Sequence, residues 1–110
     1  MLQAYNEYID ALKQFKISND ISDLKSNHLR KYNAIRTYLD INELVCIGVN
    51  QKAFDQKVCY RFWGGILNRA ATDAEAIIKD IRTEPGYEHT YDEILDVSSR
   101  WQKPGRQPWR

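Results

Sequence analysis

The chain has 110 residues, of which 43% are hydrophobic and 28% are charged, and its formal net charge is +1. This length predicts one domain with a modest core, and the balanced charge gives no overall field that would recruit nucleic acid or a membrane. No apolar run is long enough to predict a transmembrane helix, and Glu7 and Asp10 do not fit a signal peptide. We therefore expect a cytoplasmic protein that does not insert into a membrane.

Cys46 and Cys59 are the two cysteines of the chain. In a reducing compartment they are expected to be buried free thiols, with no disulfide between them. His28 and His89 form no metal-ligand spacing with them. The sequence therefore predicts neither a metal site nor a cofactor.

The first predicted helix covers residues 1–17, where apolar residues recur every three or four positions and so share one face. These residues are Leu2, Tyr5, Ile9, Leu12 and Phe15. The pattern stops at Ser18, and Asp20 is a suitable N-cap for the next helix, because its carboxylate can accept the free N–H groups of the first turn.

A heptad-like pattern then predicts one long helix from about Ile21 to Val49, with an irregularity near Asp40. Its seam consists of His28, Tyr32, Ile35, Leu39, Asn42, Cys46 and Val49, while Leu24, Leu44, Val45 and Ile47 are expected to extend and widen it. Asn42 is either a core amide with satisfied hydrogen bonds or a polar contact that sets the register or the partner. Such a seam could also be completed by a second copy, which predicts a homodimer.

The second long helix is predicted from about Gln56 to Arg82, with Asp55 as its N-cap and Phe54 in a hydrophobic staple. Its expected buried face consists of Val58, Phe62, Ile66, Ala70, Ala74, Ile77 and Ile81. Asn50 is expected to end the preceding helix in a left-handed conformation. The short connection makes the two helices an antiparallel hairpin.

Two features could interrupt this second helix. Gly64-Gly65 is tolerated most easily where another backbone approaches closely, so we expect a helix crossing there. Thr72 and Glu75 form a capping-box pattern. The helix is therefore either continuous or broken near Ala71.

Pro85-Gly86 ends the helical pattern, and a capping box at residues 90–93 predicts a short last helix to about Trp101. The predicted fold is all-α, a small bundle of about four helices around the long central hairpin. We expect residues 1–101 to form a single domain and residues 102–110 to form an extended basic tail.

The segment from Arg36 to Trp63 and the segment from Tyr91 to Trp101 resemble a bacterial and prophage helical domain of unknown function, the 4760 type. The matching residues of the first segment are Leu39, Glu43, Ile47, Gly48, Val49, Asp55, Tyr60, Trp63 and Gly64. The resemblance implies a helical fold, a bacterial or phage source, and a role in interaction more than in chemistry. It carries no known activity to this chain.

The first candidate site is a charged strip. Arg36, Asp40 and Glu43 share a helix face. They form either a solvent-side ion pair or, with Asn42, a strip that binds a partner. Two carboxylates without a histidine give little support to general acid–base catalysis.

The second candidate site is a corner of aromatic and basic residues. It consists of Tyr60, Arg61, Trp63 and Arg69, with Arg100 and Trp101 expected close in space. Such residues can stack bases and hold phosphates, or they can half-bury against neighbouring helices while the arginines stay solvated.

The third candidate is the tail. It carries basic residues and a large apolar side chain, with Arg106 and Trp109 as the expected anchors. It is either a flexible basic segment or one that docks on a surface.

No phosphate-binding loop, nucleophile elbow or paired CxxC motif occurs. The sequence therefore favours a non-enzymatic helical module that binds another protein, such as an inhibitor or accessory factor acting on a host or defence protein. The alternative is a nucleic-acid-binding accessory protein that uses the basic and aromatic residues.

Overall fold

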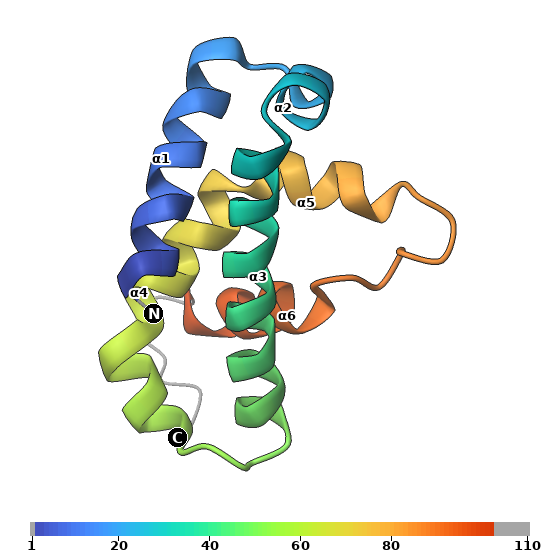
Figure 1. The fold of residues 1–110 in the computed structure, drawn as a ribbon. Helices are drawn as coiled ribbons and strands as arrows, with labels where there is room; N and C mark the ends of the chain where they lie inside the picture. The colour runs from blue at the N-terminus through green and yellow to red at the C-terminus, as the bar shows by residue number, and fades with distance from the viewer. Residues whose placement is uncertain (1, 103–110) are drawn as a thin grey trace. The chain divides into compact units, whose positions relative to one another are not determined.

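The computed structural model describes residues 2–102, and this part of the chain is entirely α-helical apart from its connections (Figure 1). Its helices are α1 (Leu2–Ser18), α2 (Ile21–Asn27), α3 (Leu29–Asn50), α4 (Gln56–Asp73), α5 (Glu75–Arg82) and α6 (Asp92–Trp101). The predicted all-α class is confirmed. The chain divides into two compact units, Met1–Ile41 and Asn42–Arg110, with the boundary inside α3.

In the first unit, α1 lies alongside the first part of α3, and α2 connects them (Figure 1). The ring of Tyr8 stacks on that of the buried Tyr38, with 4.3 Å between the ring centroids. Lys31 and Asp10 form an ion pair at 3.8 Å between the same two helices. The predicted burial of one face of α1 is confirmed at Leu12 and Phe15, which are buried. It is wrong at Leu2, which is 73% exposed.

The long helix predicted from Ile21 is broken at His28, not near Asp40. His28 leaves helical geometry with φ −134° and ψ 44°, although its N–H still donates to Leu24 and its carbonyl accepts from Tyr32. The ladder of backbone hydrogen bonds therefore continues through the break. Asp20 caps α2 as predicted, accepting from the backbone N–H of Asp23 at 3.2 Å.

The predicted seam is confirmed as a row of buried side chains from Tyr32 to Val49, whereas its first predicted member, His28, is half-buried. Tyr32, Ile35, Leu39, Asn42, Cys46 and Val49 are each at most 8% exposed. The prediction that Leu44 and Ile47 widen this buried face is wrong, because Leu44 is 67% exposed and Ile47 is 39% exposed. The homodimer stays a prediction.

The turn between α3 and α4 is a Schellman motif. The N–H of Ala53 donates to the carbonyl of Gly48 at 2.8 Å, and that of Lys52 donates to Val49 at 3.1 Å. Lys52, and not Asn50 as predicted, takes the left-handed conformation, with φ 60°. The ring of Phe54 lies so close to Gly48 that a Cβ at this position would overlap it.

After this turn, α4 runs in the opposite direction to the end of α3 (Figure 1). Asp55 caps α4 as predicted, accepting from the N–H of Val58 at 3.1 Å. The close approach predicted at Gly64-Gly65 is wrong. A Cβ at Gly65 would meet nothing within 4 Å, and one at Gly64 would meet only the Tyr60 ring of the same helix.

The second long helix is also broken, at Ala74. Thr72 does not form the predicted capping box, because its hydroxyl donates to the carbonyl of Asn68 at 3.0 Å, within α4. Ala74 itself is fully buried. The break lets α5 leave the direction of α4 while Ile77 and Ile81 stay in the core as predicted.

The connection from α5 to α6 is held by Arg82, which donates to the carbonyl of Thr90 at 2.8 Å and to Asp92 at 2.7 Å. The predicted capping box at Thr90 is wrong, because the N-cap residue of α6 is Tyr91. Tyr91 has a left-handed conformation with φ 68° and makes no side-chain cap hydrogen bond. The predicted end at Trp101 is confirmed. No helix in the described range 2–102 is long and apolar enough to cross a membrane.

Candidate functional site: a polar network and an exposed apolar face

The first turn of α6 lacks a side-chain cap of its own, and Glu43 of α3 takes that role. Its Oε1 accepts from the backbone N–H of Ile94 at 2.8 Å. Burial raises the pKa of the Glu43 carboxyl, and the backbone N–H groups of Ile94 and Glu93 oppose that shift. The negative charge also lies at the positive end of the α6 dipole. Glu43 is thus a cap supplied by another helix.

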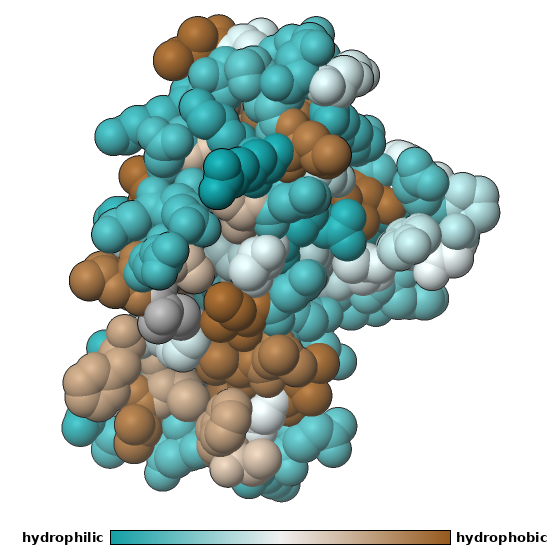
Figure 2. Space-filling model, in the orientation of Figure 1, coloured by the Kyte–Doolittle hydropathy of each residue, from teal (hydrophilic) through white to brown (hydrophobic). Residues whose placement is uncertain are grey.

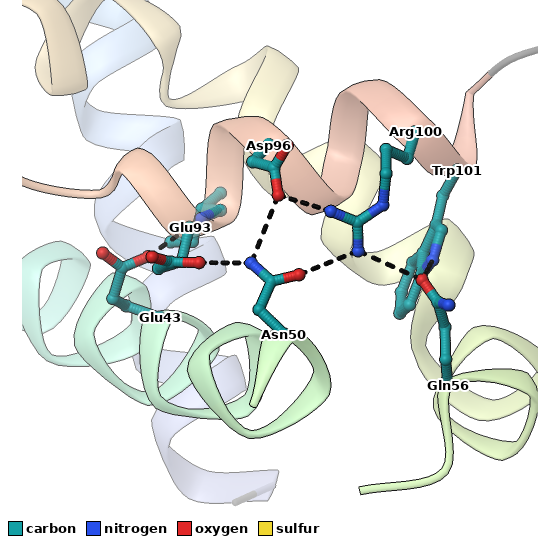
Figure 3. A network of polar contacts seen from close by, with 8 residues as sticks. Glu43, Asn50, Gln56, Glu93, Asp96, Arg100 and Trp101 are labelled. Carbon is teal, nitrogen blue, oxygen red and sulfur yellow. Dashed lines mark hydrogen bonds and ion pairs between the residues drawn. The ribbon is translucent and has the colours of Figure 1, made fainter. Parts of the chain in front are cut away.

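The rest of α6 is held at the turn between α3 and α4 (Figure 3). The Asn50 amide donates to Glu93 and Asp96, and its oxygen accepts from Arg100 at 2.8 Å. Arg100 also donates to the oxygen of Gln56 at 3.1 Å and to Asp96.

The end of α6 reaches the same glutamine, because the Trp101 indole N–H donates to the Gln56 oxygen at 3.0 Å. The network therefore joins α6 to the last residue of α3 and the first residue of α4 (Figure 3).

Cys46 is buried near this network, and desolvation raises the pKa of its thiol to about 12. A thiol with such a pKa stays protonated at neutral pH and is a poor nucleophile. Glu43 is occupied as a helix cap. The network therefore holds helices together. Among residues 2–102, no cluster of His, Cys, Asp and Glu side chains is arranged to hold a metal ion.

Of the aromatic residues predicted to bind a partner, Tyr60 and Trp63 are half-buried and Trp101 is buried. Trp63 donates its indole N–H to Oδ1 of Asn42 at 2.7 Å, and Asn42 is fully buried. Tyr60 packs edge-on against the buried Trp101, with 5.5 Å between ring centroids. Of its two predicted roles, Asn42 thus has that of a core amide with satisfied hydrogen bonds. Asn42 and Trp101 are both buried and do not reach a partner's surface.

Of the other predicted site residues, Asp40, Arg61 and Arg69 are exposed, and Arg100 is half-buried in the network. Arg61 and Arg69 therefore stay at the surface while their aromatic neighbours turn inward. Arg106 and Trp109, like most of the predicted tail, lie outside the described residues.

The feature that the sequence analysis missed is an exposed apolar face in the second unit. It consists of Leu44, Ile47, Phe54, Val58, Phe62 and Ile66, which are between 39% and 81% exposed. We call these six residues the exposed apolar face. Figure 2 shows apolar side chains gathered in the lower part of the view, where Figure 1 places the end of α3 and the start of α4.

The α4 part of this face is the stripe that was predicted to be buried. Val58, Phe62 and Ile66 follow at four-residue spacing and are 50%, 81% and 42% exposed. Periodicity identified a real stripe, but α4 turns its other side inward, with Leu67 and Ala70 buried. The sequence did carry a sign that the stripe could be exposed, because α4 has large apolar residues on both of its sides.

A groove of about 460 Å³ lies elsewhere in the second unit, between residues of α4, α5 and α6. Its cations are already paired, Lys79 with Glu75 at 2.9 Å and Arg82 with Asp92 at 2.7 Å. The groove therefore offers less for recognition than the exposed apolar face.

These features define a small all-α protein whose polar network serves the packing of its helices. Residues 1–101 match the family described as a domain of unknown function, DUF4760, and the chain belongs to this family. The resemblance seen in the sequence is thereby confirmed. No curated protein and no solved structure matches the chain.

Proposed function

We propose that this protein is a non-catalytic helical module that binds another protein through the exposed apolar face. The observation that carries the proposal is the 81% exposure of Phe62, in the middle of an apolar stripe on α4. Single exposed apolar residues are ordinary, but a contiguous patch beyond a few hundred Å² marks an interaction site. Covering such a patch contributes about 25 cal/mol per Å² of apolar surface.

The polar groups of the second unit support binding over catalysis. Glu43, Asn50 and Arg100 are engaged in holding α6, and the thiol of Cys46 is protonated at neutral pH. We further propose, from the family resemblance, a bacterial or phage source and a role as an inhibitor or accessory factor of a host or defence protein.

Nucleic-acid binding is the second proposal, and the exposed cations Arg61 and Arg69 favour it. However, Tyr60 and Trp63 are half-buried and already contact Trp101 and Asn42, which leaves less of each ring free to stack on bases. Such binding would rest on phosphate contacts and would weaken steeply with salt.

The test compares two serine variants of equally exposed apolar residues. Phe62→Ser removes the centre of the exposed apolar face, whereas Ile17→Ser changes an 80% exposed residue of α1 in the other unit. Affinity capture from bacterial lysate should retain the same partner with the wild type and Ile17→Ser and lose it with Phe62→Ser. Recovery that is equal for both variants, or no reproducible partner at all, would contradict the proposal. Circular dichroism confirms that both variants are folded.

A further inference from the structure

Cations outnumber acids around the exposed apolar face. Residues 42–72 contain four cations and two acids. The cations are Lys52, Lys57, Arg61 and Arg69, and all four are exposed. Within the described range, none of them forms an ion pair.

Both acids of this segment are already used as helix caps. Glu43 accepts from the N–H of Ile94, and Asp55 accepts from the N–H of Val58. They are therefore partly neutralised by helix dipoles. Along α4 itself, the one acid is Asp73, the last residue of the helix. The rim of the exposed apolar face is thus basic.

We propose that the partner covers this face with an amphipathic helix whose apolar stripe is flanked by acidic residues. This inference rests on the proposed function and adds the chemistry of the partner. Val58, Phe62 and Ile66 form a straight stripe on a helix, and another helix fits such a stripe with apolar residues at three- and four-residue spacing. Arg61 and Lys57 flank the stripe, where acidic side chains would meet them.

The same charges argue against a second copy of this chain as the occupant. A twofold pairing brings the same surface of both chains together. The exposed cations of both chains would then lie at the same interface. Like charges at an interface disfavour association, whereas acidic residues on a partner both favour it and speed the encounter.

The test uses two synthetic helical peptides with leucines at identical three- and four-residue spacing. One peptide has glutamate at the flanking positions and the other has lysine. Fluorescence anisotropy should show that the glutamate peptide binds at least tenfold more tightly, that its binding weakens as salt is raised, and that Phe62→Ser abolishes it. A double variant, Arg61→Glu with Arg69→Glu, should reverse the preference.

The matched control is the double variant Lys13→Glu with Lys16→Glu, which makes the same change in net charge on exposed positions of α1. This control should keep the preference for the glutamate peptide. If both peptides bind equally and through Phe62, the acidic partner is wrong and the proposed function stands. If neither binds, the inference is also overturned, and the lysate capture decides the proposed function separately.

Two further measurements would overturn the acidic partner by naming another occupant. Light scattering that shows a dimer in the wild type and a monomer in Phe62→Ser would assign the face to a second copy. Co-sedimentation with vesicles of phosphatidylcholine and phosphatidylglycerol, lost in Phe62→Ser, would assign it to an anionic lipid surface. The inference expects a monomer and no sedimentation.

Discussion

The indole N–H of Trp63 and the amide oxygen of Asn42 lie 2.7 Å apart and join α4 to α3. This bond holds one side of α4 against α3, the side on which Leu67 and Ala70 are also buried. With Trp63 directed toward α3, the stripe that contains Phe62 is turned outward. The polar residue of the apolar seam thus contacts the inward side of the helix that carries the Phe62 stripe.

Asn42→Leu should lower the free energy of unfolding by about 1–3 kcal/mol, because the indole N–H loses its acceptor in a buried site. Trp63→Phe removes the donor instead. Urea denaturation of the two single variants and the double variant would give the coupling between them. A double variant that costs the full sum of both single changes would contradict this bond.

Glu43 should make stability depend on pH in a way that Glu43→Gln does not. The pKa of Glu43 in the folded protein is raised above its ordinary 4.5, so the folded state binds more protons in the window just above that value. The associated stability is present below pH 4.5 and is lost as the pH rises through the folded pKa. The glutamine variant should therefore cost less stability at pH 7 than at pH 4. Denaturation curves at both pH values test this, and an equal cost would contradict it.

Cys46 should resist alkylation in the folded protein. Its pKa of about 12 keeps it protonated, and it is buried, whereas Cys59 is only half-buried. Iodoacetamide at pH 8 should therefore modify Cys59 first, and Cys46 only when denaturant is present. Peptide mass mapping measures both sites, and Cys59→Ser isolates the slow one. Rapid native labelling of Cys46 would contradict its burial.

Lys52→Gly should stabilise the protein by about 1 kcal/mol, because glycine adopts the left-handed conformation at the end of α3 without the steric cost of a side chain. Lys52 has φ 60°. Lys52→Ala is the matched control, since it removes the same charge but keeps the strain. In thermal denaturation, the midpoint temperature should be higher for Lys52→Gly than for the wild type and should not rise for Lys52→Ala. Equal midpoints for the two variants would contradict the steric explanation.

The sequence predicted the elements that depend on local chemistry or on repeated burial. Asp20 and Asp55 cap their helices as expected, because each cap needs only the next turn of the same chain. The buried seam around Ile35 and Leu39 was predictable because apolar residues recur at the same positions of successive heptads. The all-α class followed from these patterns.

The breaks in the helices were not predictable in the same way. His28 and Ala74 interrupt helices without a proline or glycine, so each break depends on the dihedral angles of a single residue. Thr90 looked like a cap, but Glu43, distant in the sequence, caps α6 instead. Interactions between distant residues override local motifs where they compete.

The exposed apolar face shows a further limit of periodicity. The spacing of Val58, Phe62 and Ile66 identifies a stripe but cannot say whether the stripe is covered by this chain. Of the predicted site residues, Arg61 and Arg69 remain beside the face that now carries the proposals. Their role as cations of its rim stays a prediction.

The position of Arg100 between Asn50 and Gln56 has a consequence for how the chain tolerates insertions. One guanidinium reaches the last residue of α3 and the first residue of α4 at 2.8 and 3.1 Å. An extra residue inside α4, directly after Gln56, would rotate Gln56 by about 100° relative to the rest of the helix, out of reach of both Arg100 and Trp101. The five-residue span from Gln51 to Asp55 joins two residues that contact one guanidinium, so an insertion there would be absorbed only if it left Asn50 and Gln56 in place.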